Sequence, residues 1–239
     1  MDTLTDIDLR RRRILLSMLA SGALASLPGC SSNARVVRAL PRPRMMPQST
    51  SIFQYAGSFS VNGKASDISS RVGPGDTIET NDSTEVVFVV AKDAFLLRAN
   101  SRLIINRHTI GGHYELQQGK LLSVFATRQT EIRTPSAVIS IRGTGVYLES
   151  NAALTYLCTC YGETDIATSD NPAINEAITS KHHDAPRYVL ANTNARERII
   201  PAPFINHDDQ ELQLIETLVG RSTPYVVPKG VNRTRKPYL

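Results

Sequence analysis

Two cysteines and two histidines in the last third of the chain are the residues best suited to chemistry. Cys158 and Cys160 are separated by one residue, and His182 and His183 are adjacent. If residues 154–166 form a strand, side chains alternate between its faces, so both cysteines lie on one face. Two thiolates with an imidazole suit Zn²⁺ or copper. Adjacent histidines on a strand point to opposite sides, so we expect only one of them to be a ligand.

Two other interpretations of these residues stay open. A disulfide between Cys158 and Cys160 would close a very small, strained ring, and such a bond would be labile and redox-active in an oxidising compartment. Alternatively, both thiols are structural, and the His-His-Asp segment is a polar turn held by hydrogen bonds. Asp184 is the natural carboxylate partner for a histidine here. His207 could join the group, although the start of a helix already explains its surroundings.

Motifs of hydrolases and of nucleotide-binding enzymes do not occur in the sequence. It contains no Gly-x-Ser-x-Gly, no His-Glu-x-x-His and no glycine-rich phosphate loop. Asp208 and Asp209 fall in the first turn of a predicted helix, where acidic residues are favoured for their charge alone. We therefore expect a protein without catalytic activity.

The segment that carries the cysteines and histidines, residues 151–225, is predicted to be a small α+β extension. Its first part, 154–166, reads as one or two strands around a turn at Gly162. Its last part is a helix that begins at the N-cap Asn206 and ends at Gly220. An apolar stripe of Leu212, Ile215 and Val219 would dock this helix.

Residues 53–150 are predicted to be a compact β domain. Short apolar and β-branched runs alternate with turn residues throughout, and Asn62-Gly63 is a strong signal for a hairpin turn. The spacing gives about ten short strands, as in a β sandwich, a β roll or a short β-solenoid.

An ordered series of short motifs within 57–149 resembles the FecR domain, named after the iron-dicitrate signal regulator. The series runs V-N-G-x-A, V-x-x-G-D-x-I-x-T, L-x-x-G-x-L and T-P-x-A-x-x-x-x-R-G-T. Family members often have Asp-Gly-Ser at a turn where this chain has Asp93-Ala94-Phe95. The matching positions include Val61, Gly63, Gly75, Asp76, Thr77, Ser83, Ser101, Gly119, Thr134, Pro135, Arg142, Gly143 and Thr144.

These motif residues are expected to be structural. The glycines supply positive φ at turns, and Asp76 caps its own turn. Arg142 is expected to pair with Asp76 or with a rim of carbonyls, with recognition of an anion or a partner as the alternative. The resemblance implies an exported β domain used for binding or sensing. It does not extend to sigma-factor regulation, because we expect neither a membrane helix nor a cytoplasmic domain.

The first 29 residues are predicted to be an export signal. Arg10–Arg13 precede an uncharged, mostly apolar run at 14–29. A helix of that length spans about 24 Å, which is short for a hydrocarbon core of about 30 Å. A basic segment followed by a short apolar run is typical of exported proteins, and the arginines also resemble a twin-arginine signal.

Leu27-Pro28-Gly29-Cys30 resembles a bacterial lipobox, which predicts a lipidated Cys30; the alternative is a cleaved secretory peptide. In the lipoproteins that it resembles, a following Ser31 favours the outer membrane. Residues 30–52, rich in Arg, Pro and Met without any period, would then be a flexible linker. A periplasmic protein anchored to the outer membrane by its lipid is the expected result.

The net charge of +5 is concentrated in two tails, one of them the basic segment 226–239. No basic face interleaved with aromatics points to nucleic acid. We therefore expect the partner to be an envelope protein or a cell-wall or surface polymer. The sequence favours a non-catalytic binding or sensing module, with a metal-binding or thiol-redox protein as the alternative, and it names no cofactor.

Overall fold

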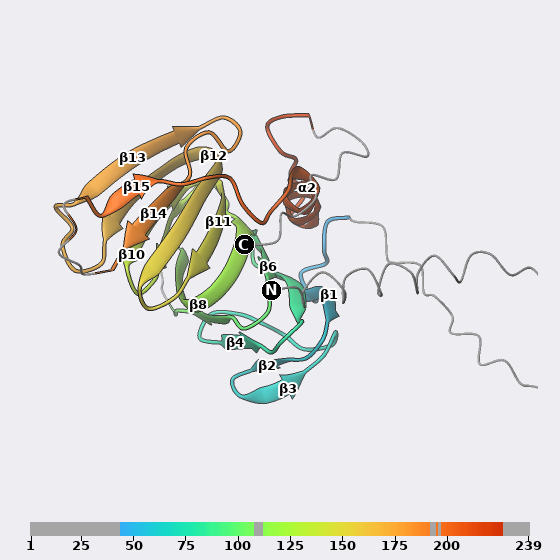
Figure 1. Cartoon of the computed structure of the whole chain (residues 1–239). Helices are drawn as coiled ribbons and strands as arrows, with labels where there is room; N and C mark the ends of the chain where they lie inside the picture. The colour runs from blue at the N-terminus through green and yellow to red at the C-terminus, as the bar shows by residue number, and fades with distance from the viewer. Residues whose placement is uncertain (1–43, 108–111, 192–194, 196, 227–239) are drawn as a thin grey trace, which may run out of the picture. The chain divides into compact units, whose positions relative to one another are not determined.

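The computed structural model describes residues 44–107, 112–191, 195 and 197–226, all within one compact unit (Figure 1). The predicted export signal, Cys30, and nearly all of the basic tail lie outside the described residues. The prediction of a mainly β protein is confirmed. The strands are β1 Ile52–Ala56, β2 Phe59–Val61, β3 Lys64–Ser66, β4 Thr77–Thr80, β5 Glu85–Val90, β6 Asp93–Leu97, β7 Arg102–Ile105, β8 Gly112–Val124, β9 Gln129–Arg133, β10 Ala137–Arg142, β11 Gly145–Ser150, β12 Leu154–Thr168, β13 Asn175–Ser180, β14 Arg187–Leu190 and β15 Ile199–Pro201, and the helix is α2 Asp209–Leu218.

The strands form two sheets that share β8 and β12. The first sheet has the order β1-β5-β6-β8-β11-β12-β14-β15. The second has the order β3-β2-β4-β7-β8-β9-β10-β12-β13. Neighbouring strands are antiparallel except for the pair β8 and β9. Two sheets facing each other bury one face of each, which accounts for the alternating burial along β4, β9 and β10.

Each shared strand changes sheet at a glycine. β8 pairs with β7 as far as Gln118, and from Gly119 onward it pairs with β11. β12 pairs with β11 up to Tyr161, and from Gly162 onward it pairs with β13. The two glycines have φ of 101° and 86°, a backbone conformation that other residues rarely adopt. A Cβ on Gly119 would also overlap Ser101.

Apolar residues fill the space between the sheets and also cover the outer face of the first sheet. The inner cluster contains stacked Phe88 and Phe95, whose ring centroids are 4.9 Å apart. The outer cluster includes Leu96 and Tyr147 of the sheet and is covered by α2. The protein is therefore built in three layers, with the second sheet, the first sheet and the helix in that order. In Figure 1, α2 lies beside the first sheet near β6.

The helix differs from the prediction at its ends. Asp208, not Asn206, is the N-cap: its carboxylate accepts hydrogen bonds from Gln210 N and Glu211 N, and Glu211 completes a capping box. Asn206 instead has a positive φ of 58°. Leu218, rather than Val219, ends the buried stripe that Leu212 and Ile215 begin, because the helix stops before Val219.

The predicted boundary at residue 150 does not separate two sheets. β12 of the expected extension pairs with β11 and β10 of the expected β domain. Among the described residues from 52 to 150, eleven strands begin, close to the expected ten, but the thirteen-residue β8 is not short. Residues 44–52 of the expected linker also belong to the folded unit, since Met46 N donates to Leu218 O and Ile52 begins β1.

The turn between β5 and β6 lies at Ala91 and Lys92. Ala91 has a φ of 55°, and Asp93 is the first residue of β6. The Asp93 side chain is fully buried and accepts hydrogen bonds from Tyr114, Arg128 and Ala126 N. A buried carboxylate needs such partners. Asp93, at the position where FecR domains often have a turn, therefore forms a buried ion pair with Arg128 here.

The hairpin turn and the cap of Asp76 are confirmed. Asn62 and Gly63 have φ of 53° and 73°, as a type I′ turn requires. The Asp76 carboxylate accepts from Gly73 N at 2.8 Å and from Asn62 Nδ2 at 2.7 Å. Arg142 is exposed, and within the described residues no hydrogen bond or ion pair joins it to Asp76.

The other motif residues also form turns and strand connections. Gly75 and Gly143 have φ of 98° and 64°. Thr134 Oγ1 accepts from Ala137 N, and Pro135 O accepts from Ser169. Thr144 Oγ1 donates to the carbonyl of Glu163 and accepts from its amide. These contacts are those of structural residues.

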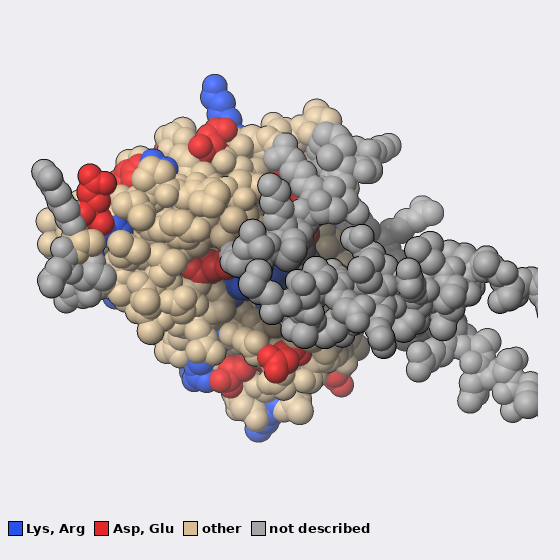
Figure 2. Space-filling model, in the orientation of Figure 1, with Lys and Arg blue, Asp and Glu red and all other residues tan. Residues whose placement is uncertain are grey.

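The described surface carries charges of both signs. On the face in Figure 2, Lys and Arg are interspersed with Asp and Glu. Among the described residues, no helix is both long enough and apolar enough to pass through a membrane.

The sheet crossing at Gly119 gives the first testable prediction. Gly119→Ala adds both the strain of a positive φ and an overlap with Ser101, whereas Gly63→Ala adds only the strain, because a Cβ there meets nothing within 4 Å. We expect Gly63→Ala to lower the free energy of unfolding by about 1 kcal/mol and Gly119→Ala to lower it by at least about 2 kcal/mol more. Urea denaturation measures both. Equal losses of unfolding free energy in the two variants would show that the fold does not depend on the close contact between Gly119 and Ser101.

Candidate metal centre

The two cysteines lie on the outer face of the first sheet, where α2 covers it. Cys158 and Cys160 belong to β12, and both side chains are fully buried in the outer cluster. This confirms that the period of the strand places them on one face. Both thiols are free, so no disulfide joins Cys158 to Cys160.

Of the two predicted histidines, His183 reaches the thiols and His182 does not. His183 lies in the loop between β13 and β14, and its amide donates to Cys160 O at 3.0 Å. Its Nδ1 lies 3.4 Å from Cys158 Sγ, and the residue is only 8% exposed. His182 is exposed, and its Nε2 lies 2.9 Å from Asp209 Oδ1. Of this adjacent pair, only His183 lies at the thiols, and both residues are in a loop and not in the expected strand. His182, His183 and Asp209 also form a second group of neighbouring ligand atoms on the more exposed side.

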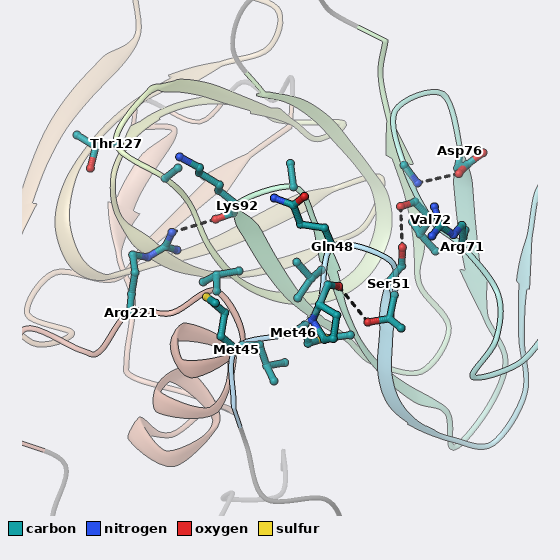
Figure 3. A pocket seen from close by; sticks show the side chains of 18 residues that line it. Met45, Met46, Gln48, Ser51, Arg71, Val72, Asp76, Lys92, Thr127 and Arg221 are labelled. Carbon is teal, nitrogen blue, oxygen red and sulfur yellow. Dashed lines mark hydrogen bonds between the residues drawn. The ribbon is translucent and has the colours of Figure 1, made fainter.

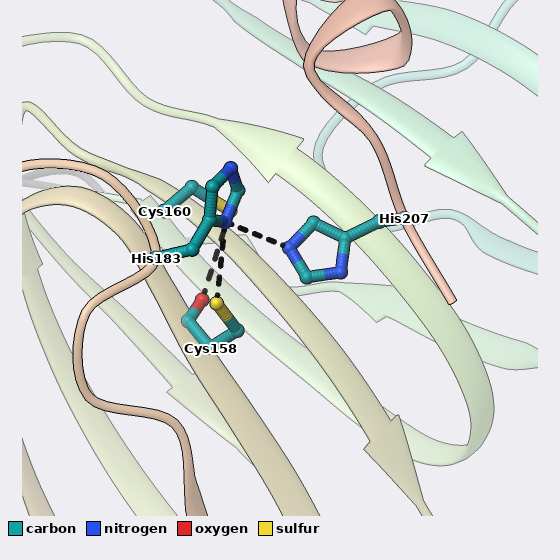
Figure 4. A group of neighbouring side chains, drawn as sticks. All are labelled: Cys158, Cys160, His183 and His207. Carbon is teal, nitrogen blue, oxygen red and sulfur yellow. Dashed lines mark hydrogen bonds between the residues drawn. The ribbon is translucent and has the colours of Figure 1, made fainter. Parts of the chain in front are cut away.

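His207 completes the group. Its Nε2 lies 3.1 Å from His183 Nδ1, and the residue is 3% exposed (Figure 4). Its ring stacks on Tyr147, with centroids 4.4 Å apart. The sequence placed His207 at the start of a helix and left open that it joins the group. It does lie directly before the N-cap Asp208, and the docking of α2 on the first sheet brings its ring to the cysteines.

Hydrogen bonds fix which nitrogen of each imidazole faces the thiols. His207 Nδ1 lies 2.7 Å from Ile205 O, and a carbonyl oxygen only accepts, so Nδ1 carries the proton. His183 Nε2 lies 3.1 Å from the Asp209 carboxylate and donates to it in the same way. His207 Nε2 and His183 Nδ1, the other nitrogens of these rings, therefore both point into the group. Such outer hydrogen bonds are typical of histidines that bind metals.

The carboxylate beside the histidines is Asp209 and not the expected Asp184. Asp184 Oδ2 instead accepts from the amides of Lys181 and His182, which closes the loop. Burial raises the pKa of Asp209, but its hydrogen bonds with His182 and His183 outweigh this and lower that pKa below its usual value. Asp209 is therefore an ionised acceptor for the outer nitrogen of His183.

Four ligand atoms converge at this site. The sulfurs of Cys158 and Cys160 and one nitrogen each of His183 and His207 all lie within 4.8 Å of one another. A tetrahedral Zn²⁺ ion with ordinary bond lengths needs its ligand atoms about 3.3–3.8 Å apart. Two of the pairs, His207 Nε2 with His183 Nδ1 at 3.1 Å and His183 Nδ1 with Cys158 Sγ at 3.4 Å, are already near those values. Small side-chain rotations would bring the other pairs of ligand atoms to these distances.

The pKa values of the two thiols are shifted in opposite directions. Burial, the strongest influence, raises the pKa of both. At Cys158, hydrogen bonds with Cys160, His183 and His207 outweigh burial and bring the pKa well below its usual value. At Cys160, burial together with the neighbouring Cys158 thiol holds the pKa well above its usual value. A divalent cation stabilises thiolates directly and so favours the loss of the second proton.

Aromatic rings enclose the site. The centroid of Phe204 is 4.7 Å from that of His183 and 4.6 Å from that of His207. The Tyr225 hydroxyl lies 3.4 Å from His183 Nε2. A buried site with four protein ligands has no open position for water, which distinguishes structural zinc sites from catalytic ones.

A separate cavity of about 1100 Å³ opens where residues 44–51 pass the end of α2 (Figure 3). Met45, Leu218, Lys92 and Arg221 are among its lining residues. Within the described chain, this lining includes neither cysteine nor histidine. The cavity therefore adds nothing to the group of thiols and imidazoles.

Comparison of the sequence with protein-family models and with curated proteins finds no match. Comparison with solved structures matches two structures of a "putative anti-sigma factor" from Parabacteroides distasonis, with TM-scores of 0.45 and identities of 13% and 12%. The similarity covers 57% of this chain and 62% of those chains. The resemblance to the FecR domain stays a prediction.

The burial of the two thiols gives the second testable prediction. In a chain of residues 31–239, which lacks Cys30, we expect both thiols to react with Ellman's reagent at least about 100-fold more slowly than a cysteine introduced at the exposed Lys92, because opening of the protein must precede attack. The comparison is made after removal of metal and repeated in denaturant, where all the cysteines should react alike. Native rates equal to that of the surface cysteine would contradict the buried geometry.

Proposed function

We propose that this protein is a non-catalytic binding or sensing module of the bacterial cell envelope that holds one Zn²⁺ ion through Cys158, Cys160, His183 and His207. The observation that carries the proposal is the convergence of these four ligand atoms, with one nitrogen of each imidazole directed into the group and the other held outside it. This ligand set is that of a structural zinc site.

The chemistry of the ligands favours zinc over hard cations. Thiolate and imidazole are soft or borderline ligands, whereas Mg²⁺ and Ca²⁺ require oxygen. Copper(I) also prefers thiolates, but two imidazoles and a tetrahedral arrangement suit zinc better. Compared with the sequence-based set, the proposed site replaces His182 with His207, because His182 contacts Asp209 on the exposed side.

The setting in the envelope is supported by the sequence. The basic and apolar segment 1–29 is proposed to direct export, and a lipid on Cys30 to anchor the chain to the outer membrane. The β unit, with its motifs similar to the FecR domain, would then face an envelope protein or a cell-wall or surface polymer. Zinc in the closed site would stabilise this unit rather than act on a substrate.

Metal content tests the proposed site. The chain of residues 31–239 is purified from an exporting host without chelator, and metals are measured by mass spectrometry. We expect about one zinc per chain, lost in Cys158→Ser and in His207→Ala because each removes a ligand. His182→Ala is the matched control and should keep its zinc. Protein without stoichiometric metal would contradict the proposal. Stoichiometric copper would show that the ion is copper and not zinc.

Cell fractionation tests the anchor. The full chain should remain with the membranes after a high-salt wash, because a diacylated cysteine carries enough apolar chain for stable attachment. We expect Cys30→Ser to move most of the protein to the soluble periplasmic fraction, while Cys158→Ser leaves its location unchanged. Equal membrane binding of the full chain and Cys30→Ser would rule out lipidation at this position.

A further inference from the structure

The ligands of the proposed site come from three separate segments. Cys158 and Cys160 belong to β12 in the middle of the first sheet. His183 belongs to the loop after β13, and His207 to residues 202–226, which we call the C-terminal cover because they lie over the outer face of that sheet. An ion bound by all four therefore ties the cover to the sheet.

Other contacts also hold the cover. Leu212, Ile215 and Leu218 are fully buried against the sheet. Arg98, at the end of β6, pairs with Glu211 at 2.8 Å and donates to the carbonyl of Asn206 at 3.2 Å. The helix is thus docked by ordinary packing and ion pairs. Because His207 directly follows Asn206, the same contacts also hold His207 in place.

The site spans the boundary between the cover and the rest of the fold. His183 Nδ1 and His207 Nε2 lie 3.1 Å apart, and the outer nitrogens of the two rings are held by Asp209 and by Ile205 O. A cation bound by both inner nitrogens and both sulfurs therefore makes bonds that are complete only when the cover is closed.

We infer that the ion controls how often the C-terminal cover, with α2, opens from the first sheet, and that the ion is released only when the cover opens. This inference rests on the proposed metal site and adds its regulation. Opening would uncover the outer apolar cluster around Leu96 and Tyr147. The fraction of molecules that expose this face would then depend on whether the metal site is occupied.

The coupling between metal binding and closure of the cover sets how much the metal lowers the open fraction. If the ion binds only the closed form, free metal at 100 times its dissociation constant lowers the open fraction about 100-fold. Hydrogen exchange of amides that exchange through this opening should slow by the same factor. The slowing should include the α2 amides, because Leu212 and Ile215 are buried against the same sheet that carries the cysteines.

Hydrogen exchange with and without zinc tests the inference on the chain of residues 31–239, with metal content measured on the same samples. We expect about 100-fold slower exchange in residues 209–218 and no change in the edge hairpin of β2 and β3. If zinc binds stoichiometrically but α2 exchange is unchanged, the inference is overturned while the metal site stands. If no zinc binds, the proposed site itself fails.

Release kinetics provide a second test that does not depend on ligand variants. Ile215→Val loosens the cover without touching a ligand, and Ile139→Val removes the same methylene from the inner cluster between the sheets. We expect Ile215→Val to speed zinc transfer to a chromophoric chelator about two- to tenfold, and Ile139→Val to leave it unchanged. Equal rates in both variants would show that release does not pass through opening of the cover.

Discussion

The positions of the candidate ligands depend on β12, one of the two strands that belong to both sheets. Its first half lies in the middle of the first sheet, between β11 and β14, and its second half lies between β10 and β13. Gly162 permits the change of sheet with a φ of 86°. Because the first half is central and pleated, Leu157 points to the inner core while Cys158 and Cys160 point outward.

Thiols on an outer sheet face would be exposed without a further layer. The C-terminal cover supplies that layer, and the same docking that buries Leu212 and Ile215 buries the site. Arg98 contributes to it from the sheet, since its guanidinium joins Glu85 and Glu211 with its side chain 9% exposed. Such a buried charge is tolerated because it is paired. Packing, ion pairing and proposed metal binding therefore act on one small segment.

The fixed orientation of the imidazoles separates this group from an accidental cluster of polar residues. A buried histidine normally satisfies both nitrogens with complementary partners. Here the outer nitrogens have such partners in Asp209 and Ile205 O. The inner nitrogens face one another and the Cys158 sulfur. A site preorganised in this way needs little rearrangement to accept an ion, which is why zinc binding is the proposal that the geometry supports best.

Local patterns in the sequence determined the β class, the Asn62-Gly63 turn, the cap of Asp76 and the shared face of Cys158 and Cys160. Each follows from backbone preferences or from the two-residue period of a strand, which need no distant contact. The exchange of His182 for His207 was decided by tertiary structure alone, as were the partner carboxylate Asp209 and the continuity of the sheet beyond residue 150. These features depend on how α2 and the β13–β14 loop dock on β12, and residues that are more than twenty positions apart in the chain carry no local pattern that fixes their distance in the fold.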